Sequence, residues 1–317
     1  MRHAQVRAPH CQCSRREMRM LTSLARAAEL IRSGGLVAFP TETVYGLGAN
    51  ALDAAAVAKI FALKGRPSTS PLIVHVASID MARRYVTEWR REAGELARRY
   101  WPGPLTLVLP KSSKIPDIVT AGLPTVGIRV PAHPIALQLI EQSGVPIAAP
   151  SANRFTHLSP TTAGHVREEF GDAVEILDGG PTQVGIESTV VSLVGGKLTL
   201  LRPGMISLGE IEKATSPEGP HPAPGMHERH YSPRTRLLLV DGPKQLPDRN
   251  GAYVWCNEAG LSSRSIRMPS DPTGYAARLY SVLRQLDDEH WPWIAVESPP
   301  DKPEWVAILD RLRRARS

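Results

Sequence analysis

The sequence predicts an α/β protein, with a twisted, mixed open sheet covered by helices and a second, smaller α/β domain after it. Short apolar runs of strand length alternate with longer amphipathic segments along most of the chain. Several runs are joined by turns too short for a crossover helix, such as Gly195-Gly196, which favours some antiparallel pairs. A Pro-rich stretch at residues 216–225 then interrupts the pattern, and we expect it to be extended and without a core of its own.

The individual elements follow from these patterns in chain order. Residues 22–33 predict a helix, because apolar residues recur every three or four positions and Gly34-Gly35 can end it. Ser207 and Glu210 have capping-box spacing and predict a short helix to about residue 214. We expect the other helices at residues 54–63, 92–100, 133–143, 162–170, 274–289 and 303–315. We expect strands at residues 36–39, 72–76, 105–109, 126–130, 145–149, 174–177, 189–194, 198–201, 237–240, 252–255 and 294–296.

Length, composition and charge limit the class of protein. The 317 residues are enough for two domains with real cores, and no apolar run approaches the length of a membrane span. The net charge is +7, but the first 20 residues hold five Arg and one Glu, so the rest of the chain argues only weakly for a nucleic-acid binder. The N-terminus lacks the apolar core of a signal peptide, and three Cys do not make a disulfide framework. We therefore expect a cytoplasmic, reduced protein that does not act at a membrane.

The most informative stretch is Lys64-Gly65-Arg66-Pro67, which joins a predicted helix to a predicted strand. Two cations on a turn above a sheet are suited to holding a phosphate. A second polar turn, residues 149–153 (APSAN), follows another short apolar run. Lys64 and Arg66 alone would be read as a solvated face, but two such turns at strand ends favour a binding site.

Other strand ends carry cations and hydroxyls as well. Arg129 ends a predicted strand and could fork onto a carboxylate or phosphate, although an edge-strand salt bridge is an equal alternative. Further groups of this kind are residues 40–48 (PTETVYGLG), Thr125, residues 159–161, residues 185–189 and residues 200–204. Each signal is modest, and residues 40–48 could equally be a plain strand-to-helix turn. Together they predict one concave, basic site.

Several common motifs are absent or weak. Residues 46–51 match a loose dinucleotide fingerprint, but no acidic residue ends a following strand at the required distance. The sequence has no Walker loop, no Gly-x-Ser-x-Gly elbow and no His-Glu-x-x-His. His227 and His230, or His10 with Cys11 and Cys13, could touch a metal, but neither group offers a complete ligand set. We expect no metal site formed by the protein alone.

These residues, in this order, resemble the threonylcarbamoyl-AMP synthase family, the YrdC-like domain proteins. The resemblance covers roughly residues 21–212 and rests on the segments PTETVYGLG (40–48), KGRP with PLIVH (64–75), WPGPLTLVL (101–109), TVGIRVP (125–131), APSAN (149–153), SPT (159–161), IESTVV (186–191) and LRPG (201–204). The linker PGMHERHYSP (224–233) and the C-terminal part look like the two-domain branch of that family. The implied organisation is a disordered extension (1–20), a YrdC-like catalytic domain (21–214), a linker or lid (215–234) and a small Rossmann-like α/β domain (235–317).

The resemblance implies a reaction in which L-threonine, bicarbonate and ATP give threonylcarbamoyl-AMP and pyrophosphate. The product would pass to a tRNA threonylcarbamoyl transferase complex, and direct tRNA contact is only weakly supported. Threonine and bicarbonate form a carbamate, whose oxygen attacks the α-phosphorus of ATP, so the reaction needs positioning and charge stabilisation more than a covalent nucleophile. Mg²⁺ would arrive with ATP.

The resemblance also assigns site residues. The catalytic residues would be Lys64, Arg66, Ser151 and Asn153. The ATP side would hold Arg66, Ser70, Thr125, Ser151, Ser159, Arg202 and Tyr231. The threonine side would hold Thr43, His75, Arg129, Ala149 and Ser188, with Arg129 taking the carboxylate. Ser70 departs from the Asn usual in the family and reaches less far toward a phosphate.

Alternatives stay open at this point. Tyr231 could be a lid over the nucleotide, which would exclude water from unstable intermediates, or a linker anchor packed on the first domain. An RNA-binding module could use the same basic concavity without catalysis, although the 5% aromatic content argues against base stacking. A third reading is an enzyme acting on another carbamoyl acceptor, as in related domains of hydrogenase maturation proteins, but nothing here resembles the other segments of those proteins.

Overall fold

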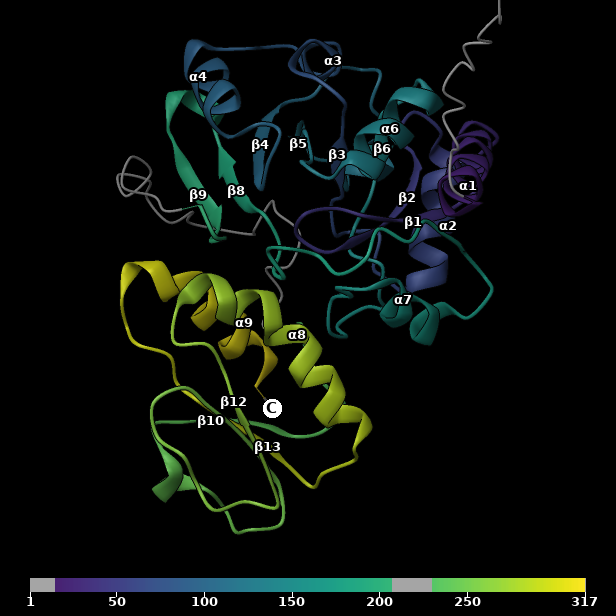
Figure 1. The fold of residues 1–317 in the computed structure, drawn as a ribbon. Helices are drawn as coiled ribbons and strands as arrows, with labels where there is room; N and C mark the ends of the chain where they lie inside the picture. Colours follow the sequence, from purple (N-terminus) through teal and green to yellow (C-terminus); the bar gives the residue numbers. More distant parts are fainter. Residues whose placement is uncertain (1–14, 207–229, 317) are drawn as a thin grey trace, which may run out of the picture.

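The computed structural model describes residues 15–206 and 230–316, with side chains from residue 23 onward, and it contains two separate sheets (Figure 1). The expectations for the short helix to residue 214, the Pro-rich stretch, His227 and residues 1–14 lie outside the described residues. The domain boundaries given above stay predictions.

The first sheet has nine strands in the order β7-β1-β2-β6-β3-β5-β4-β8-β9. The sheet mixes parallel and antiparallel pairs, as the short turns predicted: β3 pairs in parallel with β5, whereas β4 and β5 are antiparallel. The strands are β1 (Val37–Pro40), β2 (Tyr45–Asn50), β3 (Ile73–His75), β4 (Leu105–Pro110), β5 (Thr125–Arg129), β6 (Ile147–Ala148), β7 (Glu175–Ile176), β8 (Thr189–Ser192) and β9 (Thr199–Arg202).

Helices cover both faces of this sheet. On one face, α1 and α6 pack together over β1 and β6 around Ile31, Phe39 and Leu139. On the other face, α2 and α4 bury Val57, Ile60 and Ala97 in the main core. The helices of this domain are α1 (Arg15–Arg32), α2 (Ala54–Lys64), α3 (Ile79–Arg83), α4 (Arg91–Tyr100), α5 (Asp117–Thr120), α6 (Pro134–Ser143) and α7 (Ala163–Phe170). The first helix thus begins at Arg15, earlier than predicted.

Helix α2 ends in a way that places the basic turn. Its N-cap Asp53 accepts hydrogen bonds from the amides of Ala55 and Ala56. At the other end Gly65 adopts a left-handed conformation with φ 64°, which glycine tolerates without a Cβ penalty. The amide of Arg66 then donates to the carbonyl of Phe61 at 3.1 Å. This cap ends the helix and reverses the chain at Gly65. The side chains of Lys64, the last helical residue, and Arg66, the first residue after Gly65, therefore point in different directions.

Strand β2 is the main local difference from the sequence expectation, which read residues 40–48 as a turn. It pairs antiparallel with both β1 and β6. A Cβ at Gly48 would lie 2.7 Å from side-chain atoms of Phe39 and Ile147, so glycine permits this close packing of three strands. Because residues 46–51 form a strand and a turn rather than the start of a helix, the loose dinucleotide fingerprint has no structural counterpart.

The second domain is a four-stranded, all-parallel sheet in the order β10-β13-β11-β12, with helices packed on it. Its elements are β10 (Leu237–Val240), β11 (Ala252–Trp255), β12 (Arg264–Arg267), α8 (Pro272–Asp288), β13 (Ile294–Glu297), a 3₁₀ turn (Pro303–Trp305) and α9 (Val306–Ala315). The edge strand β12 was not predicted, because its side chains alternate only between half-buried and exposed.

The two domains share a core. Helices α8 and α9 lie between the small sheet and the first domain (Figure 1). Val44, Leu158 and Ile186 of the first domain belong to the same apolar cluster as Tyr231, Tyr280 and the interior of the second domain. Arg284 on α8 adds an ion pair to Glu169 on α7 at 3.1 Å. The second domain is therefore packed directly against the loops that carry the basic residues.

Candidate functional site

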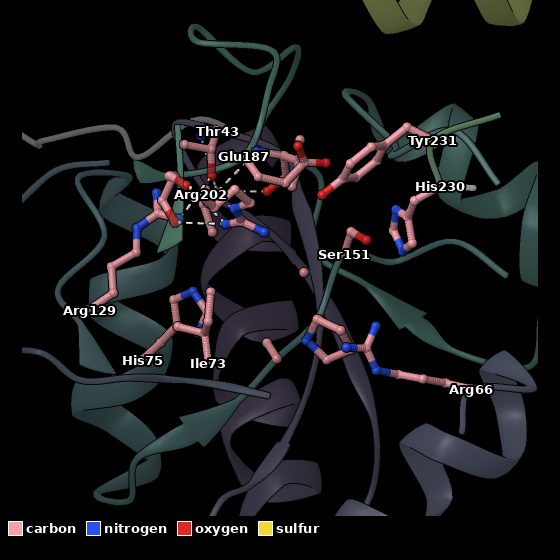
Figure 2. A pocket seen from close by; sticks show the side chains of 16 residues that line it. Thr43, Arg66, Ile73, His75, Arg129, Ser151, Glu187, Arg202, His230 and Tyr231 are labelled. Atoms are coloured by element: carbon pink, nitrogen blue, oxygen red, sulfur yellow. Dashed lines mark hydrogen bonds between the residues drawn. The ribbon is translucent and has the colours of Figure 1, made fainter. Parts of the chain in front are cut away.

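Residues at the ends of several strands of the first domain line one pocket (Figure 2). The space between its lining residues is about 540 Å³ with the adjoining open solvent included, and about 50 Å³ of it can hold the centre of a water molecule. Of the residues assigned from the sequence, those that line it are Thr43, Arg66, His75, Arg129, Ala149, Ser151, Ser188, Arg202 and Tyr231. The predicted concave, basic site therefore exists, and three arginines line it.

Arg129 forms one end of the pocket, and its guanidinium is already bonded within the protein. It makes an ion pair with Glu42 at 2.7 Å, and donates to the Thr43 hydroxyl at 3.0 Å and to the Gly103 carbonyl at 3.2 Å. The ion pair is almost fully buried. The salt bridge of the alternative reading is thus present, but β5 lies between β3 and β4 and is not an edge strand. Any carboxylate ligand would share Arg129 with Glu42.

His75 lies next to Arg129 in the sheet register, and the structure makes it a neutral residue. Burial, together with the charge of Arg129, lowers the pKa of His75 to about 3. Its Nδ1 is buried and has no hydrogen-bond partner among the described residues. A neutral imidazole with an unpaired nitrogen is suited to a polar ligand group at this end.

Arg66 lies at another side of the pocket, near His230 and Tyr231, with Ser151 between these groups and the Arg129 end (Figure 2). Its guanidinium donates to the carbonyls of Ser70 and Pro71 and lies over the ring of Phe155. In the described part of the chain, no carboxylate lies within 4.0 Å of it. Burial lowers the pKa of Arg66 to about 10, so it is still a cation at neutral pH.

A buried cation without a carboxylate partner is unusual, because burying a charge is costly unless it is paired. Arg66 is only 7% exposed. Its position on the wall of a pocket means that an anionic ligand could supply the missing charge. The burial of Arg66 is therefore the strongest chemical indication that this pocket binds an anion.

Lys64 was assigned to catalysis, and the structure places it behind the pocket wall. The ammonium group donates to the carbonyl of Ser151 at 2.6 Å and to the carbonyl of Asn153. Burial, and then the charge of Arg66, hold the pKa of Lys64 well below its ordinary value. Lys64 therefore fixes the turn that presents Ser151, and it does not line the pocket.

Four other assigned residues also lie outside the pocket lining. The Asn153 side-chain amide donates to the carbonyls of Arg154 and His157, and Ser70 is buried with its carbonyl facing Arg66. Ser159 donates to the carboxylate of Glu187 at 2.5 Å. Thr125 lines a different small hollow, between β3, β4 and β5. Asn153, Ser70 and Ser159 therefore support the segments around the pocket, whereas Thr125 lies away from it.

Sequence reasoning left Glu187 and His230 out of the site, and both line the pocket. Glu187 immediately precedes Ser188, so its position in the chain was the available signal. His230 was weighed only as a metal ligand. It is buried, and its ring contacts Phe155 at 5.8 Å and Tyr231 at 4.1 Å between ring centroids.

Tyr231 enters the pocket from the segment between the domains. It is 1% exposed, it stacks on Tyr280, and its hydroxyl has no hydrogen-bond partner among the described residues. Its φ is 60°, a strained value for a residue with a side chain. The burial and stacking of Tyr231 fit the interpretation of this residue as an anchor packed on the first domain. Its hydroxyl, which has no partner among the described residues, is available to a ligand in the pocket.

The comparisons with known proteins agree with this geometry. A family model for Sua5, YciO and YrdC, described as "Telomere recombination", matches residues 29–204. A second model, described as "Threonylcarbamoyl-AMP synthase, C-terminal domain", matches residues 201–317. The chain belongs to the Sua5/YciO/YrdC family.

Relatives of this family match nearly the whole chain. The threonylcarbamoyl-AMP synthase of Pyrococcus abyssi is 45% identical, over 91% of this chain and 92% of that protein. The enzyme of the same name from Bacillus subtilis is 43% identical over 92% of each chain. The crystal structure of P. abyssi Sua5 complexed with L-threonine matches this structure with a TM-score of 0.87 and 42% identity, over 92% and 93% of the two chains. The mixed α/β architecture and the second domain are therefore those of Sua5.

In the described part of the chain, no helix has both the length and the apolar character needed to cross a membrane.

Proposed function

We propose that this chain is a threonylcarbamoyl-AMP synthase, which joins L-threonine, bicarbonate and ATP into threonylcarbamoyl-AMP and releases pyrophosphate and water. The observation that carries the proposal is the buried Arg66, which has no carboxylate partner among the described residues, on the wall of a pocket shared with Arg129, in a chain 45% identical to a protein of that name. The pocket can seat an anion at the Arg66 side and an amino acid at the other.

The amino acid would bind at the end formed by Thr43, His75 and Arg129. Its carboxylate would share Arg129 with Glu42, and its polar groups would meet the neutral His75. Ser188 and the backbone at Ala149 would complete this end. In this pose the threonine amine would face the middle of the pocket, where it would react with bicarbonate to give a carbamate and water.

The triphosphate would bind toward Arg66 and Arg202, with Ser151 as a hydroxyl donor. The carbamate oxygen attacks the α-phosphorus and pyrophosphate leaves from the opposite side, so the protein's task is to align the two and to balance developing charge. Mg²⁺ would enter bound to ATP as part of that substrate. Lys64 and Asn153 would act through the turn that presents Ser151, rather than on the phosphates directly.

Tyr231 would close over the nucleotide as a lid. Its buried hydroxyl, which has no hydrogen-bond partner among the described residues, and its contact with His230 support this role, because closure would protect the carbamate and the mixed anhydride from water. We further propose that the product passes to a tRNA threonylcarbamoyl transferase complex in the cytoplasm. Direct contact with tRNA stays a prediction.

The test is pyrophosphate release by the purified protein. We expect release only when ATP, threonine and bicarbonate are all present, and a product with the mass of threonylcarbamoyl-AMP. Release that is unchanged without threonine would refute the proposal. RNA binding with a steep salt dependence, and no pyrophosphate release, would favour the RNA-binding alternative instead.

A further inference from the structure

A buried ion pair joins the second domain to the wall of the pocket. Glu187 lines the pocket, and its Oε2 accepts a hydrogen bond from Nε of Arg311, on α9, at 2.7 Å. The Arg311 side chain is 0% exposed and that of Glu187 is 8% exposed. Tyr280, on α8, donates to the same carboxylate at 3.1 Å. Two helices of the second domain therefore converge on one carboxylate of the first.

The Arg311 guanidinium also holds the backbone beside two other pocket residues. Its Nη2 donates to the carbonyl of Pro203 at 3.1 Å and to that of Glu187 at 3.4 Å. Pro203 follows Arg202 in the chain, and Glu187 precedes Ser188. Arg202 in turn donates to the carbonyl and the hydroxyl of Ser188. One side chain of the second domain thus fixes the spacing of two segments that line the pocket.

The charge of Glu187 makes this contact important for an anionic ligand. Burial would raise the pKa of Glu187, but the charges of Arg311 and Arg202 outweigh it and hold the pKa below its ordinary value, so the carboxylate is charged at neutral pH. A negative charge on the pocket wall would repel a polyphosphate if it were not balanced, and the repulsion would be strong in a poorly solvated site.

We propose that Arg311 is a positioning residue of the pocket, which neutralises Glu187 and holds the Ser188 and Arg202 segments so that the pocket can bind the triphosphate of ATP. This rests on the proposed function. The second domain therefore contributes the charge balance of the pocket, beyond any role of the segment that connects it to the first domain.

The test compares steady-state kinetics of Arg311→Met with those of a matched control, Arg314→Met. Arg314 lies on the same helix and donates to Asp310, as Arg311 does, but its side chain is not hydrogen-bonded to Glu187 and it does not line the pocket. Because an unbalanced Glu187 repels the highly charged ATP more than zwitterionic threonine, Arg311→Met should raise the KM for ATP about tenfold and that for threonine less. Arg314→Met should change neither by more than about twofold.

The double variant Glu187→Gln with Arg311→Met separates charge from simple loss of structure. It removes both charges, so it should return the KM for ATP to within about threefold of the wild-type value. Failure of this rescue in a folded double variant, or an equal rise of both KM values in Arg311→Met, would overturn the proposal.

A second pair of variants, with smaller changes, tests the proposal if Arg311→Met does not fold. Tyr280→Phe removes only the hydroxyl that donates to Glu187, and should raise the KM for ATP about threefold. Tyr275→Phe is its control, because Tyr275 is equally buried on α8 and its hydroxyl has no partner among the described residues. Identical kinetics for these two variants would then refute the proposal. An inactive wild-type protein would instead refute the proposed function, and this inference with it.

Discussion

Replacing Lys64 by methionine tests whether a buried cation holds the turn at Ser151 and Asn153. Lys64 is 3% exposed, and its ammonium donates to the carbonyls of both residues. A hydrogen bond from a charged donor is worth about 1.5–3 kcal/mol, so the loss of two would cost about 3–6 kcal/mol. Removing a buried cation returns part of this, because burial and Arg66 already disfavour the charged form and lower the pKa of Lys64. We expect the free energy of unfolding to fall by about 2–4 kcal/mol.

The measurement is urea denaturation followed by circular dichroism, together with pyrophosphate release. Lys59→Met is the matched control, because Lys59 lies on the same helix but donates to a single carbonyl, that of Gly34, at 2.6 Å and at the surface. We expect it to lose about 0.5–1 kcal/mol and to keep full activity. Lys64→Met should lose at least about tenfold in kcat/KM, because the turn presents Ser151 to the pocket. Equal midpoints and equal rates for the two variants would refute this account of Lys64.

Three further outcomes follow from the site and the domain interface. Arg66→Ala should reduce kcat/KM more than Lys64→Ala, because only the guanidinium lines the pocket and can fork onto two oxygens; equal losses in steady-state kinetics would contradict this ranking. Burial would raise the pKa of Glu169, but hydrogen bonds from His157 and the Arg154 amide, and the charge of Arg284, lower it to about 2. The contribution of Glu169 to the free energy of unfolding is therefore complete above the pKa of a Glu in the unfolded chain, and it is lost as the pH falls through about 2. Urea midpoints of Glu169→Gln and wild type should therefore differ at pH 6 and converge near pH 2; a constant difference would argue against the ion pair. Truncation at residue 215 should leave a folded first domain with weakened turnover, and full turnover would contradict both the lid and the role given to Arg311.

The sequence predicted most of the fold because hydrophobic periodicity carries it. The helices at residues 54–63, 92–100, 133–143 and 162–170, and the strands between them, lie within two residues or so of the observed elements. Strand β2 was not predicted because Gly46 and Gly48 have low strand propensity. Only the alternation of the apolar residues Tyr45, Leu47 and Ala49 could have indicated it. The need for glycine there arises from the close approach of Phe39 and Ile147, which are distant in the chain and cannot be read from a local pattern.

The site was predicted less completely than the fold. Strand-end patterns and the family resemblance identified the arginines that line the pocket. They could not tell a side chain that faces the pocket from one that faces the turn behind it. Lys64 and Arg66 are two residues apart, and the left-handed Gly65 between them sends one behind the wall and the other onto it. The contribution of Arg311 was equally inaccessible, because it depends on how two domains pack.

Charge pairing separates the roles of the arginines around the pocket. Arg129 is paired with Glu42 and Arg311 with Glu187, and all four side chains are at most 8% exposed. These pairs satisfy their own charges, so they shape the pocket without requiring a ligand. Arg66 is almost as deeply buried, yet its contacts are two carbonyls and an aromatic ring. A cation held this way gains stability from an anion placed beside it, because the anion replaces the solvation that burial removed. We therefore expect an anionic ligand at Arg66 in preference to Arg129 or Arg311, which agrees with the proposal that the triphosphate binds at Arg66 and the amino acid at the other end of the pocket.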